Sequence, residues 1–475
     1  MTDFMPNRRG VIAIAIIGLI CAGPSGASAE TLAEALAIAY VANPALEAER
    51  ARLRATDEQV PQAFSGWRPT ITAEGKFGTI QSDSQISSFS GLAIPGFTGS
   101  TKTTVDPLSY SLNIKQPVFE GGRTLFGTRR AEESVLAGRQ SLRTAEQSTL
   151  LDAATAYMDV LRDEAVVDLR KKNVEVLRRQ LEAATDRFEV GDNTRTDVAQ
   201  SEARLSLSNS NLVSAQGVLT RSRATYERVI GQAPGTLESP KDIPPLPSSE
   251  EEALAAALEH NPVLLAARHA ERASAEAVKV AKGSILPSVS LEATYEYAED
   301  PSSSVARNEQ SSAFARLSIP LYQSGAEYSR IREAKQTNSR NRLLIADAQR
   351  QVEQSVANAW ELLRTARARL DSDRDQVRAN EIALEGVEQE AQVGSRTTLN
   401  VLDAEQELLD ARVALVGTTR DEIVAAYTVL TSIGRLTAKE LGLDVNYYDP
   451  TDNYADVKDR WIGYGILYDD VAETP

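Results

Sequence analysis

Few side chains in this sequence could carry catalytic or metal chemistry, and they form no recognised pattern. The two histidines, His260 and His269, have no cysteine nearby and no His-x-x-x-His spacing, so a metal site is unsupported. Gly121-Gly122 lacks the Gly-Lys-Ser/Thr of a phosphate-binding loop. The chain has 67 acidic residues, so neighbouring acids on helix faces carry no weight for acid–base catalysis. We therefore expect no enzyme activity, no catalytic residues, no cofactor and no metal.

One stretch of polar sequence occurs twice, at 190–202 and at 393–405. Each copy follows a long charged helical run and contains one glycine, then a Thr-rich corner, then a renewed helical pattern. This order is typical of a helix that stops at glycine and a second helix that starts at a threonine cap. The stop and start residues are Gly191 and Thr194 in the first copy and Gly394 and Thr397 in the second. We therefore predict the tips of two helical hairpins.

The duplication extends over nearly the whole chain of 475 residues. Asn43-Pro44 recurs 218 residues later as Asn261-Pro262, whereas Gly191 recurs 203 residues later as Gly394. The 15-residue difference lies between Pro69 and Pro117, so one loop of the first copy is longer. We predict two structural repeats, at 30–235 and 250–434, joined by a Pro-rich linker at 236–249 and followed by an aromatic tail at 435–475.

The first 29 residues are predicted to be a signal peptide. Arg8-Arg9 precedes an apolar run over 11–21, and the small-residue site Ala27-Ser28-Ala29 precedes Glu30. The only cysteine, Cys21, lies in this segment, so the exported chain is expected to contain no disulfide. A net charge of −16 and a pI near 4.9 argue against nucleic acid as a partner.

Four short segments alternate between apolar and polar residues and are predicted to be strands, at about 69–80, 109–118, 288–297 and 312–321. Phe314 is out of phase in the last of them. A soluble sandwich would give the same pattern. The Ser/Gly/Pro/Thr-rich segments 81–106 and 298–311, together with charges on the polar faces, favour outer-membrane hairpins with long exterior loops. Four strands cannot enclose water, whereas three chains would supply twelve.

Long stretches without proline predict helices at about 123–190, 194–231, 326–392 and 397–433. The two shorter ones carry a seven-residue repeat, for example Leu402, Leu409 and Val416, with a line of small residues beside it. Such a repeat is typical of helices packed side by side as in a coiled coil. The predicted fold class is mostly α with a small β part. In it, long coiled-coil hairpins form a trimeric α-barrel that continues into a shared 12-stranded transmembrane β-barrel.

Several of these motifs resemble the TolC family of outer-membrane efflux proteins. They are Gln-Pro-Val-Phe-Glu-Gly-Gly at 116–122, its echo Pro-Leu-Tyr-Gln-Ser-Gly at 320–325, the two Asn-Pro steps and Val-Gly-Ser-Arg-Thr-Thr-Leu-Asn-Val-Leu-Asp-Ala at 393–404. The resemblance implies a homotrimer in the outer membrane of a Gram-negative bacterium, with a helical tunnel across the periplasm. It also implies a periplasmic adaptor protein and an inner-membrane pump of the ABC, RND or MFS type as partners.

The resemblance also implies roles for four residues near the hairpin tips. Asp403 matches a ring of aspartates that narrows the periplasmic aperture, and Asn400 stands where relatives carry a second aspartate. Arg396 and Asp197 match the residues that latch the closed state, whereas Ala391 replaces a tyrosine of that latch. A carboxylate ring selects cations and binds hard multivalent ions. Independently of the resemblance, Asp403 could be an acid that merely favours a helix N-terminus.

The function predicted from the sequence is a passive exit duct whose energy comes from a partner pump. One alternative is a type I secretion duct dedicated to polypeptides, which would use the same architecture. A second, from a different class, is a soluble periplasmic coiled-coil adaptor or scaffold, which would explain the heptads but leave the alternating strands without a role.

Overall fold

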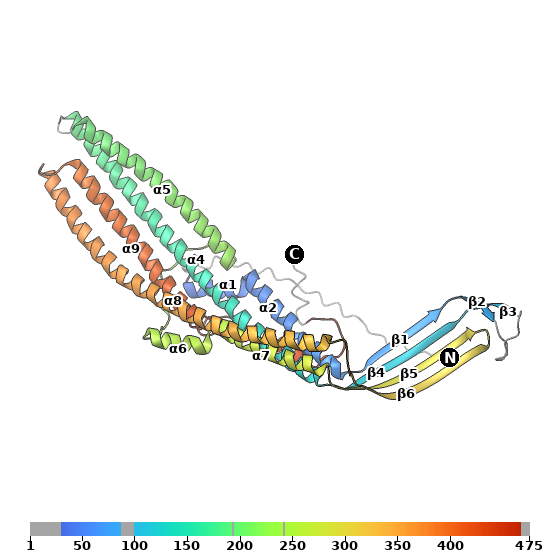
Figure 1. Ribbon diagram of the computed structural model, residues 1–475. Coiled ribbons are helices and arrows are strands. Elements are labelled where there is room, and N and C mark those ends of the chain that lie inside the picture. The colour runs from blue at the N-terminus through green and yellow to red at the C-terminus, as the bar shows by residue number, and fades with distance from the viewer. Residues whose placement is uncertain (1–29, 87–98, 192–193, 241–242, 467–475) are drawn as a thin grey trace, which may run out of the picture.

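The structure is a computed structural model that describes residues 30–86, 99–191, 194–240 and 243–466. The predicted signal peptide, part of the linker and the end of the tail lie outside the described residues. The chain is elongated, with a β-sheet at one end, two helical tips at the other and a cluster of shorter helices between them (Figure 1).

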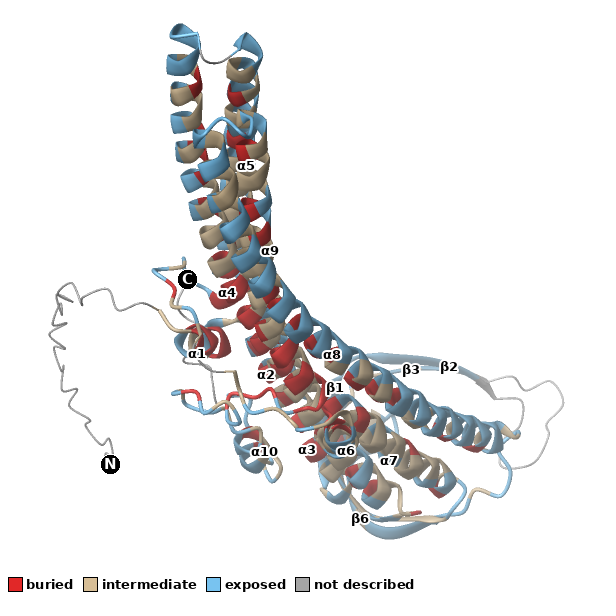
Figure 2. Cartoon of the chain, turned by 90° about the vertical axis from the view of Figure 1, so that its left-hand side faces the viewer, coloured by how far each residue is buried: buried red, intermediate tan, exposed pale blue. Residues whose placement is uncertain are grey.

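Two long helical hairpins form most of the chain. The first consists of α4 (Arg123–Glu189) and α5 (Arg195–Ile230), and the second of α8 (Ala326–Gln392) and α9 (Thr398–Ser432). A helix of 67 residues, the length of both α4 and α8, is about 100 Å long at 1.5 Å per residue. The hairpins lie alongside each other, with α9 against α4 (Figures 1 and 2). Within the described residues, we find no helix both long and apolar enough to cross a bilayer.

The two Asn-Pro steps tie the short helices to the ends of the long ones. The first step joins α1 (Leu32–Ala42) to α2 (Pro44–Asp57), and the second joins α6 (Glu250–His260) to α7 (Pro262–Gly283). The side chain of Asn43 accepts a hydrogen bond from the Ala45 backbone at 2.9 Å, which caps α2, and donates one to the Val229 carbonyl at 2.8 Å. Asn261 caps α7 in the same way and donates to the Ser432 carbonyl at 2.8 Å. Each asparagine therefore caps one helix and holds the end of another.

The main hydrophobic core lies where α1 and α2 pack on the middle of α4, the region coloured as buried in Figure 2. Tyr157 and Tyr226 are fully buried there. The Tyr157 hydroxyl lies within hydrogen-bonding distance of the carbonyl oxygens of Glu30 and Glu238, at 2.7 and 2.6 Å, and burial raises the pKa of both tyrosines. Trp360, which is half-buried, also lies against this core.

Three further short elements lie between the main parts of the chain and in its tail. The segment α3 (Gln59–Phe64) and the 3-10 turn η1 (Ser65–Trp67) lead from α2 to the sheet, and α10 (Asp452–Val457) lies in the tail. The tail is attached by a hydrogen bond from the Ala438 backbone to the Glu146 carboxylate at 2.8 Å and by one from Asn453 to the buried carboxylate of Asp57 at 2.8 Å. It therefore follows the outside of α2 and α4 as a mainly irregular segment.

The sheet is antiparallel and combines both repeats in the order β1-β4-β5-β6. Its strands are β1 (Thr70–Phe77), β4 (Leu108–Glu120), β5 (Ser288–Ser302) and β6 (Val305–Ser318). The register places apolar or small residues opposite one another, as in the row Ala73, Leu112, Tyr295 and the row Ile71, Ile114, Ala293, Ala313. One face of the sheet is therefore mainly apolar, although its side chains are exposed in a single chain.

The opposite face of the sheet is polar and carries charged pairs between strands. The Glu292 carboxylate lies 2.9 Å from Arg316 on β6 and 3.8 Å from Lys115 on β4. Phe314, the residue out of phase in the sequence, lies opposite Glu292 on this polar face and is largely exposed. An apolar face and a charged face on the same strands fit a sheet with lipid on one side and water on the other.

The prediction of exterior loops over all of 81–106 and 298–311 was wrong, because parts of both segments form strands. Beyond a short break at Gly78-Thr79, the first hairpin continues as β2 (Ile80–Ile86) paired with β3 (Gly99–Val105). The second hairpin closes with only residues 303–304 between β5 and β6. These strand ends are polar and rich in Ser, Thr and Glu, so they lack the apolar alternation by which the strands were recognised. Backbone pairing between adjacent strands does not require an apolar face.

Candidate functional site

The tip of the first hairpin is organised by Thr194 and Asp197. Gly191 adopts a left-handed φ of 87°, which ends the α4 hairpin arm. The backbone N–H and the hydroxyl of Thr194 donate to the Asp197 carboxylate at 3.0 and 2.6 Å, and the Asp197 N–H donates back to the Thr194 hydroxyl at 3.3 Å. These bonds form a capping box and lower the pKa of Asp197.

The tip of the second hairpin has the same geometry with an amide in place of the carboxylate. Gly394 has a φ of 79°, and α9 starts at the Thr397 cap. The Asn400 side-chain oxygen accepts hydrogen bonds from the Thr397 N–H at 3.2 Å and from its hydroxyl at 2.8 Å. An amide is sufficient for this cap, since capping requires only an acceptor oxygen. Gly191, Thr194, Gly394 and Thr397 all lie at the tips.

Arg396 and Asp197 are not brought together within one chain. The Arg396 Nε lies 2.7 Å from Glu390 at the end of α8, and about half of each side chain is exposed. Asp197 is engaged in its own cap on the other hairpin. A latch between Arg396 and Asp197 therefore stays a prediction, which can concern only a contact between neighbouring chains.

Asp403 forms a contact that sequence reasoning missed. The Arg204 Nη2 on α5 donates to the Asp403 Oδ1 on α9 at 2.5 Å, which joins the two hairpins close to their tips. The exposed fractions of the two side chains are 33% and 49%. The residues are 199 positions apart, and no motif or repeat links them, because their contact depends on how the hairpins pack.

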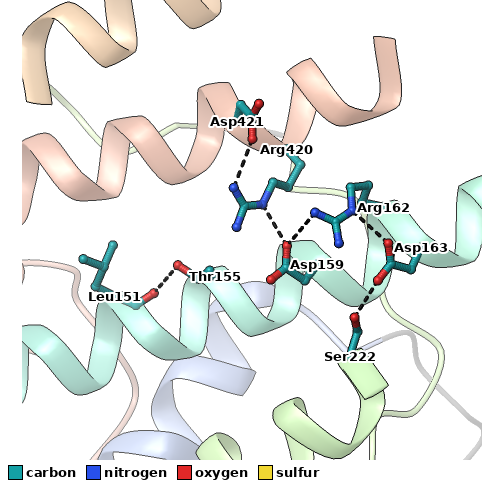
Figure 3. Close-up of polar contacts among 8 residues, drawn as sticks. All are labelled: Leu151, Thr155, Asp159, Arg162, Asp163, Ser222, Arg420 and Asp421. Carbon is teal, nitrogen blue, oxygen red and sulfur yellow. Dashed lines mark hydrogen bonds and ion pairs between the residues drawn. The ribbon is translucent and has the colours of Figure 1, made fainter. Parts of the chain in front are cut away.

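Two further ion pairs join the hairpins nearer the body of the chain. Arg170 on α4 lies 3.9 Å from Asp410 on α9, and Arg420 on α9 lies 2.9 Å from Asp159 on α4. Figure 3 shows the second pair, in which Asp159 also contacts Arg162 at 3.0 Å. Arg162 in turn contacts Asp163 at 2.8 Å, and Asp163 accepts a hydrogen bond from Ser222 on α5 at 2.5 Å (Figure 3).

These contacts place α4, α5 and α9 in one polar network. Asp163 is buried, and its hydrogen bond raises the pKa of the Arg162 guanidinium. The other charged side chains of the network, Asp159, Arg162 and Arg420, are partly buried, with exposed fractions of 26%, 30% and 20%, and each has a partner. The more exposed Arg204–Asp403 pair lies farther from the core, where ion pairs contribute less to stability. The hairpins are therefore joined by a less exposed ion pair at Asp159 and by a more exposed one near the tips.

The histidines occupy two different surroundings. His269 Nδ1 lies 2.7 Å from the Glu133 carboxylate, whereas His260 lies 4.0 Å from Glu259 at the end of α6. In the part of the chain that the structure describes, no three His, Cys, Asp or Glu side chains gather closely enough to hold a metal ion.

The two-faced sheet and the long hairpins define a class of protein, the outer-membrane channels with a helical periplasmic part. The family model described as "Outer membrane efflux protein" matches residues 36–232 and 253–435, which cover most of each predicted repeat. The chain therefore belongs to this family, the TolC family, and is an outer-membrane protein. This location is incompatible with a soluble periplasmic scaffold.

Individual proteins agree with this assignment. The chain is 34% identical to the outer membrane efflux protein BepC of Brucella suis over 95% of both chains. It is 26% identical to the outer membrane protein TolC of Vibrio cholerae over 88% of this chain and 93% of that protein. The solved structure of the Campylobacter jejuni CmeC outer membrane channel shares the fold, with a TM-score of 0.74 and 15% identity over 97% of this chain and 98% of that one.

Proposed function

We propose that three copies of this chain form a passive exit duct from the periplasm through the outer membrane. The observation that carries the proposal is the register of the sheet, which puts mainly apolar rows on one face and the Lys115–Glu292–Arg316 cluster on the other. The outer edges of β1 and β6 pair with no strand among the described residues. Joining these edges between three chains would close a barrel of twelve strands around water.

The helical hairpins support the same assembly. In a single chain, α8 exposes large apolar side chains, among them Leu343, Leu362 and Ile382, and α5 exposes Leu207 and Val213. Exposed apolar residues spaced along a helix of about 100 Å fit burial against a partner surface. The hairpins of neighbouring chains would provide that surface, and six hairpins around an axis would form a tube that continues into the barrel.

The tips are the proposed periplasmic entrance of this tube. Asp403 and Asn400 of the three chains would form the aperture ring, while Arg396 and Asp197 would latch neighbouring chains in the closed state. Both proposals rest on the family resemblance and on the position of these residues at the tips. Asn400 and Asp403 lie in the first two turns of α9, Asp197 lies in the first turn of α5, and Arg396 precedes the Thr397 cap of α9. Opening of the entrance would then require the second hairpin to separate from the first.

The energy for transport would come from partner proteins. The sequence holds no phosphate-loop motif, and a passive duct needs none. We propose that a periplasmic adaptor docks on the exposed hairpin tips and connects them to an inner-membrane pump of the ABC, RND or MFS type. Lipid of the outer membrane would surround the apolar face of the sheet.

The cargo is proposed to be small molecules, because the Brucella suis relative is described as an efflux protein. A strain that lacks this chain is expected to become more susceptible to several chemically unrelated drugs, with an unchanged set of secreted proteins. Susceptibility and secreted proteins are measured side by side, and a plasmid copy of the gene serves as the control. Unchanged susceptibility with the loss of a secreted polypeptide would instead identify a type I secretion duct.

A further inference from the structure

The contact between Arg204 and Asp403 changes the charge expected at the entrance. Asp403 is the only carboxylate of the proposed aperture ring, because its neighbour in that ring is Asn400. Its carboxylate oxygen lies 2.5 Å from the Arg204 guanidinium of the same chain. Among the described residues, neither side chain has a second hydrogen-bonding or ion-pairing partner. Each Asp403 charge is therefore matched by one cation.

The polar groups of the two capping motifs and of the Arg396 contact are already engaged. The Asn400 oxygen is engaged in capping α9, and Asp197 is engaged in capping α5. Glu390 is paired with Arg396 at 2.7 Å on the outermost turn of the second hairpin. The acid at the proposed ring position thus has one specific counter-charge, which comes from the first hairpin.

We propose that Arg204 is a selectivity-determining residue of the entrance, a role that rests on the proposed function. In the closed entrance, three Arg204–Asp403 pairs would form a ring of zero net charge that neither selects cations nor holds a divalent ion. Separation of the hairpins would uncover three carboxylates around the passage, and a ring of carboxylates favours cations. The entrance would therefore become cation-selective as it opens.

The partial exposure of the pair suits this role. An ion pair with exposed fractions of 33% and 49% is screened by water and contributes little to stability. A docking partner can therefore separate it, whereas the less exposed Arg420–Asp159 pair would keep the hairpins joined farther from the tip. The two contacts between the hairpins thus differ in exposure, and the pair near the tips is the more exposed one.

The test measures ion selectivity of the purified full-length trimer in a planar bilayer under a KCl gradient. Arg204→Gln is expected to raise the conductance, shift the reversal potential toward K⁺ and introduce block by Mg²⁺ added on the side of the tips. Asp403→Asn is expected to raise the conductance and shift the reversal potential toward Cl⁻, because it leaves Arg204 unpaired. The exchange of both residues, Arg204→Asp with Asp403→Arg, should restore the wild-type values.

A matched control is Arg223→Gln, which removes the same charge from the same helix. Arg223 pairs at 2.7 Å with Glu164 of its own hairpin, so its loss should leave selectivity unchanged. The role of Arg204 would be overturned if Arg204→Gln and Asp403→Asn shifted the reversal potential equally in the same direction, or if neither shifted it. Either result would leave the duct intact. A wild-type trimer that never conducts would overturn the duct itself, and the role of Arg204 with it.

Discussion

Replacement of Leu112 by arginine is expected to prevent assembly in the outer membrane, whereas the same replacement at the adjacent Ser111 should be tolerated. Leu112 lies between Ala73 and Tyr295 on the apolar face of the sheet. An arginine that faces lipid near the middle of the bilayer costs about 2–4 kcal/mol per chain, and three chains share the barrel. The expected result is loss of the protein from the membrane fraction.

Ser111 is the matched control because it lies on the opposite face of the same strand. Its neighbours across the sheet are Glu74 and Glu296, so an arginine there would gain two carboxylates in water. Both variants are compared by fractionation and by the heat-sensitive migration of the oligomer in detergent gels. Equal tolerance of the two arginines, or equal loss, would show that the two faces do not separate lipid from water.

Replacement of Gly434 by alanine is expected to destabilise the body of the protein severely. Gly434 has a left-handed φ of 79° and follows Ile433, the C-cap residue of α9. A Cβ atom at this position would lie 2.5 Å from the His260 carbonyl oxygen and 2.9 Å from the Cα of Asn261, both of which are backbone atoms. The clash and the left-handed backbone together should cost about 3 kcal/mol or more.

The size of this effect follows from what Gly434 adjoins. Asn261 caps α7 and holds the Ser432 carbonyl, so displacement of its backbone would loosen the joint between α6, α7 and α9. The control is Gly394→Ala at the tip, where φ is also 79° but no atom lies within 4 Å of the added Cβ. That variant should lose only about 1–2 kcal/mol. Thermal unfolding of the purified proteins compares them, and similar losses would contradict the packing at Gly434.

The features predictable from the sequence were those that depend on local spacing. The Asn-Pro steps at Asn43 and Asn261 marked helix boundaries because proline disfavours helix at the preceding residue. Gly191 and Gly394 marked the tips because a left-handed residue ends a helix there. Alternation along β1, β4, β5 and β6 predicted a sheet with two different faces, and the register confirms it.

Features that depend on packing between distant segments were not predictable. The Arg204–Asp403 pair arises from how the two hairpins pack, and no local motif links its two members. Asn43 and Asn261 have a second role, as donors to the carbonyls of Val229 and Ser432. This role also depends on how distant helices pack and has no local signal. The polar strands β2 and β3 were missed because their residues resemble those of a loop.

The central claim is that three chains share their strands to enclose water, and a cross-linking experiment tests it most directly. Cys21 is the only cysteine and lies in the predicted signal peptide, so Thr72→Cys on β1 and Ser312→Cys on β6 would be the only thiols of the exported chain. The register places both positions in one row on the polar face, at the two open edges of the sheet.

The protein with both cysteines is treated in membranes with a flexible bismaleimide and then fully denatured. We expect species of two and three chains and none larger, because three chains close a ring, and we expect no cross-linked species from either single-cysteine variant. A product that never exceeds one chain, recovered from the soluble periplasmic fraction, would contradict the shared barrel and the duct that depends on it.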